Sequence, residues 1–599
     1  MSIENYELYE SDSPAVDGFK RELIESVSAG EPWELAERFS ELERVSGSAD
    51  EREAADYISE RLDAHGVAHE WYEPELWLSI PHGASLTATS PERESFDSAK
   101  TVSFSGSGTV EREVVYLEGP SADTMEEMLN ASVGNVGPNV EGKIVLIEAM
   151  SLSTETIANL QDQGAEAFVG VHPHPDEPHE GIATPIWGAV PEPGRSNRLP
   201  KMPIANVSRT DGDRLMELAR GDESLKVELT TDVNRDWFEC PLITARILGE
   251  ANPDNDDFVL LHGHYDSWHV GIADNATGDA GLLELARVFD EHRDRLSRDL
   301  WVAWWPGHST GRYAGSTWFA DEFAHELVEN CVAQVNMDSP GAADATEFEM
   351  TMRMPEADAL VREAIADVAG KESPETRPPR AGDYSFNNLG LSGLFMLSSN
   401  IPADVREARG YHPVGGCGGN SNAWHLTTDT LDKADPNVLV RDIRVYAYAL
   451  GRLLTAEVVP LDHRQTIEVH HDALADLDEA AGDHFDLSSA LDKLNELGDA
   501  VETLYDGIDS GDINAATADE AIKSLSRSLV RLDFTSGGQF EQDPAFERPH
   551  YPTLAPAADL SELEGDEYKF QKVHLNRALN SVVYKLHQAR ETLPTNVNH

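Results

Sequence analysis

The sequence predicts an α/β protein with a mostly parallel central sheet that is flanked by helices. Three observations lead to this prediction. From about residue 242 to 454, short apolar strands alternate with amphipathic helices, which is typical of a parallel sheet buried on both faces. Between about residues 94 and 236, short strands are separated by Gly, Pro and Asn. After Pro460 the strand pattern ends and helical periodicity takes over.

These changes of pattern divide the chain into segments, and its 599 residues are several times the length of a usual single domain. We expect the N-terminal part of the main domain at 1–93 and an inserted β/α domain at 94–236. The rest of the main domain should occupy 237–458, followed by a helical domain at 459–599.

The N-terminal segment has helical spacing. Residues 33–66 read as two amphipathic helices that are interrupted at Gly47. Ser48 and Glu51 have the spacing of a capping box, which favours a new helix directly after the glycine.

The inserted segment reads as alternating strands and helices. Strands are predicted at 144–148 and 167–171, with a helix at 155–163 between them and a second helix after Asp211.

The loop after the second of these strands contains His172, His174 and His179. Histidine-rich loops can bind metal, but three prolines lie among these residues and no carboxylate pattern accompanies them. We expect an exposed loop without a catalytic role.

The main domain should contain strands at 258–262, 300–304 and 332–337, with helices at 281–291 and up to Phe323. In open α/β sheets, ligands bind beyond the carboxyl ends of the strands. The residues that follow these strands are therefore candidates for a functional site. Past this domain, helices with apolar stripes are predicted at the C-terminus, namely at 474–504, 518–532 and 568–592.

The charge of the chain is extreme. It has 109 Asp and Glu against 46 Lys and Arg, a formal net charge of -63. Such a chain repels nucleic acid and anionic membranes, so neither is expected as a partner. The acids are spread over every segment and 40% of the residues are hydrophobic, which argues against disorder.

We interpret this charge as adaptation to a high-salt cytosol. In molar salt the Debye length is about 3 Å, so self-repulsion is screened, and instability at low salt is expected. The alternative is that the acidic surface only keeps the protein soluble and monomeric.

Cellular context follows from what the sequence lacks. Cys240, Cys331 and Cys417 are far apart, which argues against a disulfide framework or a thiolate zinc site. The acidic N-terminus does not resemble a secretion signal, and no apolar run approaches the roughly 18 residues of a membrane span. We expect a cytoplasmic protein.

Four residues beyond the predicted strands have side chains that bind metals. His264 and Asp338 follow strands, Asp274 lies in a turn before a helix, and His425 lies in a later loop. Any one of them alone would be an ordinary polar loop residue. Two histidines and two aspartates together suit zinc or a similar divalent ion. Asp266 could accept the other imidazole N–H of His264 and so fix its tautomer.

With these residues in this order, the run resembles the catalytic domain of co-catalytic zinc peptidases, particularly the branch of glutamate carboxypeptidases and transferrin receptors. The shared motifs are His-x-Asp at 264–266, Asp-Asn at 274–275, a later aspartate at 338, and a final histidine at 425 followed by Asp-Thr. The insert resembles the protease-associated domain of that branch in residues 142–146, and the helical end resembles its dimerisation domain.

The resemblance implies a role for each residue. His264 and Asp338 would hold one zinc ion, His425 would hold the other, and Asp274 would bridge them, while Asp266 would support His264. One or two divalent ions would activate water to hydrolyse a peptide or a related amide, as in aminopeptidases and carboxypeptidases. A homodimer through the helical end would also be expected.

The chain departs from the family where a Glu-Glu pair is expected, because residues 305–316 contain no carboxylate. Counting from the preceding strand puts His308 and Ser309 in place of the pair, and counting back from Gly315 puts Ser309 and Thr310 there. In the family, the first glutamate is the general base and the second binds a metal. His308 could fill either role, but not both with one nitrogen.

Further residues near the site could contact substrate. Trp424 stands where the carboxypeptidases have a tyrosine that helps to hold the oxyanion, and an indole can only donate. Ser309, Arg353 and Tyr384 are other candidates, since an arginine could bind a substrate carboxylate through two hydrogen bonds. Arg312, Tyr313 and Arg380 fall in the same group of loops.

Three functions stay open on the sequence alone. The leading hypothesis is a metal-dependent peptidase-type hydrolase acting on a small peptide or an amino-acid-derived substrate. The loss of the Glu-Glu pair also allows a catalytically silent relative that acts in binding or assembly. A third possibility is a non-peptidase amidohydrolase or cyclase that uses the same metal site.

Overall fold

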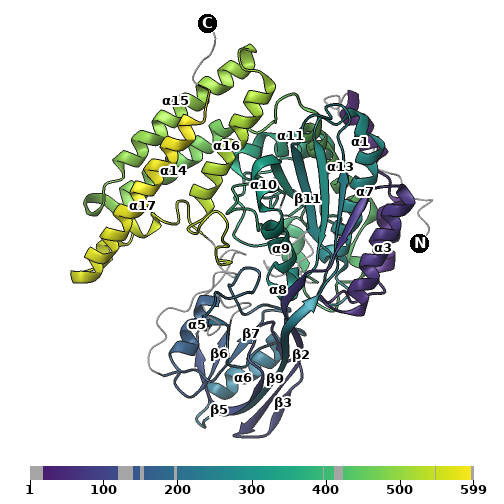
Figure 1. The fold of residues 1–599 in the computed structure, drawn as a ribbon. Coiled ribbons are helices and arrows are strands. Elements are labelled where there is room, and N and C mark those ends of the chain that lie inside the picture. The colour runs from purple at the N-terminus through teal and green to yellow at the C-terminus, as the bar shows by residue number, and fades with distance from the viewer. Residues whose placement is uncertain are drawn as a thin grey trace.

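The fold is described from a computed structural model (Figure 1). The described residues are 18–118, 139–148, 154–194, 198–395, 397–409, 423–546 and 548–594. Cys417 lies outside them, whereas Cys240 and Cys331 are buried free thiols.

A six-stranded sheet forms the centre of the larger region, with the strand order β1-β10-β12-β11-β13-β14. Strands β11, β12, β13 and β14 pair in parallel, and β1 and β10 add an antiparallel edge. The predicted α/β class is confirmed, although the sheet is mixed. The strands are β1 (His69–Tyr72), β10 (Leu242–Ile247), β11 (Phe258–His264), β12 (Asp299–Trp305), β13 (Cys331–Asn336) and β14 (Gly393–Leu394).

Helices cover both faces of this sheet, which explains its continuous apolar strands. Every residue of β11, β12 and β13 is buried. Because side chains alternate along a strand, Val259 and Leu261 face one apolar core while Leu260 faces another. The first core contains α1 (Gly18–Ser26), α2 (Gly30–Phe39), α3 (Ala49–His65), α7 (Thr277–Glu291), α11 (Asp358–Ala369) and α13 (Pro436–Thr455), and the second contains α9 (Ala314–Glu322) and α10 (Ala324–Asn330).

A second sheet has eight strands in the order β3-β2-β9-β5-β6-β7-β8-β4, with helices α5 (Thr154–Asp162) and α6 (Arg209–Ala219). In Figure 1 it lies below the first sheet, and β2 and β9 connect the two. The strands are β2 (Glu75–Ser90), β3 (Glu94–Phe96), β4 (Lys100–Thr101), β5 (Gly108–Leu117), β6 (Ile144–Glu148), β7 (Ala167–Val171), β8 (Ile204–Val207) and β9 (Lys226–Glu239).

The second sheet begins at Glu75, earlier than the expected boundary at residue 94, because β2 pairs with β9 over its whole length. Pro81 and Gly83 lie at a shift of register between the two strands, and the strand continues through them.

Beyond residue 460 the elements are helices, as the sequence predicts: α14 (His463–Ala481), α15 (Ser488–Ser510), α16 (Ala515–Phe534) and α17 (Gly565–Glu591). The helix predicted at 474–504 is two helices, because the chain adopts a positive φ of 51° at Gly482. Among the described residues, none of the helices has both the length and the apolar character needed to cross a bilayer.

Candidate metal centre

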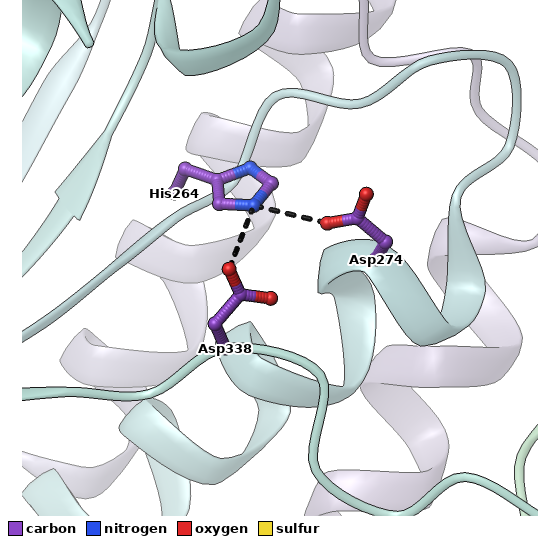
Figure 2. Close-up of side chains that lie close together, drawn as sticks. All are labelled: His264, Asp274 and Asp338. Carbon is purple, nitrogen blue, oxygen red and sulfur yellow. Dashed lines mark ion pairs between the residues drawn. The ribbon is translucent and has the colours of Figure 1, made fainter. Parts of the chain in front are cut away.

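Three of the predicted metal ligands lie at one edge of the six-stranded sheet (Figure 2). His264 is the last residue of β11, and Asp338 lies two residues beyond the neighbouring parallel strand β13. Asp274 lies in the turn Ile272–Ala276 that leads into α7. Since parallel strands end at the same edge of a sheet, these positions, distant in sequence, come together in space.

The geometry of these three side chains fits a shared cation. Nε2 of His264 lies 3.1 Å from Oδ1 of Asp274 and 3.9 Å from Oδ2 of Asp338. Ligand atoms at about 2.1 Å from a tetrahedral zinc ion are separated by roughly 3.4 Å. Nε2 of His264 is buried between the two carboxylates, and the ligand atoms of all three side chains lie within 4.8 Å of one another.

His425 faces the other oxygen of Asp274. Its Nε2 lies 3.2 Å from Oδ2 of that carboxylate, so the two oxygens of Asp274 face two different histidines. The His425 ring stacks on Trp424 with ring centres 3.8 Å apart, and Trp268 contacts it edge-on. A second cation could therefore lie between Asp274 and His425, and Trp424 forms part of its wall.

The second nitrogen of each histidine donates a hydrogen bond to a backbone oxygen, which fixes the ring. Nδ1 of His264 lies 3.0 Å from the backbone oxygen of Asp266, and the carboxylate of Asp266 is farther away, at 3.7 Å. This corrects the expectation that the carboxylate holds the imidazole. The Asp266 carboxylate instead accepts the backbone N–H groups of His308 and Ser309. Nδ1 of His425 lies 3.1 Å from the backbone oxygen of Glu180.

The electrostatics are those of a buried site with excess negative charge. Burial lowers the pKa of His264, but Asp274 and Asp338 outweigh it and raise that pKa well above its ordinary value. Burial would raise the pKa of Asp274, yet its two histidines hold it well below the usual range. Burial and the neighbouring Asp274 raise the pKa of Asp338. A divalent cation would offset the charge that these carboxylates share.

Two buried residues that the sequence analysis did not single out hold the ligand loops in place. The guanidinium of Arg44 donates to the backbone oxygens of Tyr265, Val270 and Gly271, at 2.7 to 2.9 Å. Nδ2 of Asn275 donates to the backbone oxygens of His264 and Met337, both at 3.0 Å. Asn275 therefore links the ends of the two strands that carry His264 and Asp338. Asn275 was visible only as part of the Asp-Asn motif, and nothing in the sequence marked Arg44.

Asp429 supports the Asp274 turn from the opposite side. It accepts the backbone N–H groups of Ala273 and Asp274 at 3.0 and 3.1 Å. Burial raises the pKa of Asp429 to about 7. The expected Asp-Thr sequence after the last histidine therefore has a structural role beside the bridging carboxylate.

His308 is the first residue of a short helix, α8 (His308–Gly311), and its ring lies parallel to that of His264 with centres 3.7 Å apart. Its Nδ1 lies 2.9 Å from Oδ2 of Asp383, whose other oxygen accepts a hydrogen bond from Ser316. Although burial raises the pKa of Asp383, the His308 imidazole holds it below its usual range. His308 and His425 both lie outside the group of three described residues, His264, Asp274 and Asp338, whose ligand atoms converge.

Asp383 is a further residue that sequence reasoning missed. Its neighbour in the sequence, Tyr384, was considered as a substrate contact, but no pattern marked Asp383 itself. The His308–Asp383 pair leaves Nε2 as the nitrogen of His308 that is not engaged by this carboxylate.

One predicted substrate contact, Arg353, is wrong. Arg353 is fully buried, and its guanidinium donates to Asp358, Ser373 and the backbone of Thr351, so it has no donor left for a substrate. Tyr384 is also fully buried, in an apolar cluster with Trp187. Ser309 is 2% exposed and meets Asp266 through its backbone.

The expectation of an exposed histidine loop in the insert is also wrong. His172 and His179 are buried, and their rings stack with centres 4.3 Å apart. His179 contacts Trp424 edge-on, so this loop packs against the wall of the centre. Sequence polarity suggested exposure here, whereas contacts with a distant loop bury these rings.

Comparisons with known proteins agree with the expected family. The sequence model of Peptidase family M28 matches residues 243–450, a range that includes the four candidate ligands and His308. The probable glutamate carboxypeptidase VP8 of Zea mays is 25% identical over 434 residues, which cover 61% of this chain and 60% of that protein. Transferrin receptor protein 1 of Gallus gallus is 22% identical over 345 residues, covering 49% of this chain and 43% of the receptor. The chain thus aligns with about half the length of these relatives.

A solved structure shows the same fold. BSAP, a zinc aminopeptidase from Bacillus subtilis, superposes with a TM-score of 0.52 and 15% sequence identity. The match covers 72% of this chain and 96% of that one.

Proposed function

We propose that this protein is a metal-dependent hydrolase of peptide or related amide bonds, because residues 243–450 match the sequence model of Peptidase family M28. The observation that carries the proposal is the convergence of ligand atoms from His264, Asp274 and Asp338 to within 4.8 Å of one another. Asp274 and Asp338 are both buried beside one another, and a cation between them would offset the cost of burying two carboxylates together.

We expect zinc or another divalent ion to be held by His264, Asp338 and one oxygen of Asp274, and a second ion by His425 and the other oxygen. The zinc aminopeptidase with the same fold favours zinc, as does the mixture of imidazole and carboxylate ligands. Zinc bound there supplies Lewis-acid chemistry, which polarises a carbonyl and lowers the pKa of water.

His308 is proposed as the general base in place of the glutamate that the family has. Asp383 accepts the Nδ1–H of His308 and so fixes the tautomer in which Nε2 is free to accept a proton from the attacking water and return it to the leaving nitrogen. In the alternative, His308 binds the second metal through Nε2, the nitrogen that Asp383 does not engage.

The proposal is tested with the zinc-loaded chain in concentrated KCl, on a panel of aminoacyl, acyl-amino-acid and dipeptide substrates. We expect His308→Ala to lower kcat by about 10²- to 10⁴-fold, the usual contribution of a general base, with bound zinc unchanged. Asp383→Asn should lower kcat less and shift its pH profile, since it removes the partner of the base without removing the base. Exposed His325 in α10 provides a matched control, His325→Ala.

If the native chain binds zinc but turns over no member of the panel, the second candidate is favoured, a silent relative that acts in binding or assembly. The specific observation behind it is the absence of any carboxylate from residues 305–316, together with the similarity to a transferrin receptor. Turnover confined to modified amino acids would instead favour a non-peptidase amidohydrolase or cyclase.

A homodimer through α17 is also proposed. Phe570, Val573 and Tyr584 are 65%, 48% and 59% exposed on this helix. Between Glu567 and Glu591 the helix has no acidic residue, although the chain carries a net charge of -63. Its basic residues there are Lys569, Lys572, Arg577, Lys585 and Arg590. This face suits the acidic surface of a second copy.

We further propose that the protein works in a high-salt cytosol. Sedimentation velocity checks both ideas. We expect a dimer in concentrated KCl that becomes a monomer on Phe570→Glu, and an expanded, unfolded chain in dilute buffer. A monomeric native chain in concentrated KCl would contradict the dimer, and a compact chain at low salt would contradict the salt adaptation.

A further inference from the structure

One short stretch of the insert, residues 177–180, bonds to both loops that carry the candidate ligands. One of these loops runs from His264 to Asp274, and the other contains His425. The stretch follows β7 of the second sheet, so it reaches the centre from outside the six-stranded sheet.

Glu180 bonds to His425 through its backbone in both directions. The backbone oxygen of Glu180 lies 3.1 Å from Nδ1 of His425, and the N–H of Glu180 donates to the backbone oxygen of His425 at 3.1 Å. The first bond sets the orientation of the imidazole, and the second sets the position of the backbone that carries it. Together they aim Nε2 of His425 at Asp274.

The side chains of the same stretch hold the neighbouring residues. The Glu180 carboxylate lies 3.0 Å from Nε2 of His269, in the other ligand loop. The Glu177 carboxylate accepts a hydrogen bond of 2.7 Å from Thr427. Both carboxylates pair with the ammonium group of Lys100, which is 2.9 Å from Glu180. Lys100 is the first residue of β4 and is fixed there by its pairing with β8.

The two histidines held by Glu180 have backbones that need support. His269 has φ of 54° and His425 has φ of 57°, in the left-handed region that side chains other than glycine rarely adopt. Such conformations persist where surrounding contacts fix them, and they are frequent at functional sites. Glu180 supplies contacts to both.

We propose that Glu180 and Lys100 are positioning residues of the metal centre, so that binding of a cation between Asp274 and His425 requires the insert to be docked. The inference rests on the proposed function in one respect, namely that the centre binds metal. It assigns the insert a role in building the centre. Binding between His264 and Asp338 should not share this dependence, because His264 is oriented by Asp266 of its own loop.

Lys100 is the residue to change, because its loss affects the whole stretch. Without its ammonium group, the Glu177 and Glu180 carboxylates repel each other beside His425. The two glutamates should then move away from each other, and the His425 ring should lose its fixed orientation. Loss of an outer partner of a metal ligand typically weakens metal binding about 10- to 100-fold.

The test is a calorimetric titration of the metal-free full chain with zinc chloride in concentrated KCl. For the native chain we expect two binding events. Lys100→Met should weaken one of them about 10- to 100-fold and leave the other within about twofold. Lys100→Arg keeps the charge and should restore both events. Lys226→Met is the matched control, since Lys226 is exposed on the same sheet and has no ion pair among the described residues.

Thr427→Val is a milder variant that removes a single hydrogen bond to Glu177. It should weaken the same binding event a few-fold, without a risk to folding.

Hydrogen exchange measures the reverse effect, namely how zinc binding affects docking of the insert. If the docked insert favours zinc binding, zinc must equally favour docking. Zinc should therefore slow exchange of the Glu180 amide in the native chain, and this slowing should be lost in Lys100→Met. Equal zinc affinities in Lys100→Met and Lys226→Met would overturn the inference while leaving the proposed function intact. A single binding event in the native chain would also overturn it. Absence of any zinc binding by the native chain would remove the proposed function together with the inference.

Discussion

The two histidines that face Asp274 are held by different parts of the molecule. His264 is 1% exposed, ends a central strand, and is oriented by the backbone of Asp266 two residues away. His425 has a side chain that is 14% exposed, lies in a loop, and is oriented by Glu180 of the insert. The first half of the centre is thus part of the sheet, while the second is assembled from three segments. The halves should therefore respond differently to mutation.

The largest effect should come from Asp274→Asn, which breaks both halves at once. The amide cannot offer two charged oxygens to two cations, so zinc affinity should fall by more than the roughly 100-fold expected for an outer partner, and any turnover should be lost. Zinc content after dialysis measures the result, and exposed Asp254→Asn serves as the control.

His425→Ala should have a smaller effect and sharpens the comparison. Because His264, Asp338 and one oxygen of Asp274 remain, we expect one zinc ion to be retained per chain. If His425→Ala and Asp274→Asn lose zinc equally, the two halves are not separable and the comparison fails.

The smallest effect concerns acid stability away from the centre. Burial lowers the pKa of His470 to about 4, against about 6.5 for an unfolded histidine. The unfolded chain therefore binds a proton between these pH values that the folded chain does not. The contribution to stability is complete above about pH 6.5 and is lost as the pH falls to about 4, an effect of roughly 3 kcal/mol.

His470→Gln should consequently reduce the loss of unfolding free energy between about pH 6.5 and 4, as measured by denaturant unfolding of the metal-free chain. His470 packs against Tyr551 and not against the metal centre. The experiment therefore distinguishes acid destabilisation of the fold from destabilisation caused by loss of zinc. If the unfolding free energy of His470→Gln falls with pH as steeply as that of the native chain, another group titrates in this pH range.

Much of the fold and the ligand set could be predicted from the sequence. Continuous apolar strands predicted the sheet, and strand ends carried His264 and Asp338, because both signals are local. The residues that were missed act across long distances in the chain. Arg44 meets the loop after Tyr265, Asp383 meets His308, and no local pattern marks such contacts.

The errors have the same cause. Arg353 stands in a loop that the sequence places near the site, but local spacing does not show that packing consumes all of its hydrogen-bond donors. Likewise, the loop with His172 and His179 looks exposed in the sequence until the contact of His179 with Trp424 is known.

The central claim is that His264, Asp274 and Asp338 bind a cation together. A crystal structure of the zinc-loaded chain, with anomalous diffraction recorded on both sides of the zinc absorption edge, tests it most directly. We expect an anomalous peak about 2.0 to 2.2 Å from Nε2 of His264 and from a carboxylate oxygen of each aspartate. Zinc found only elsewhere, with these three side chains apart, would contradict it.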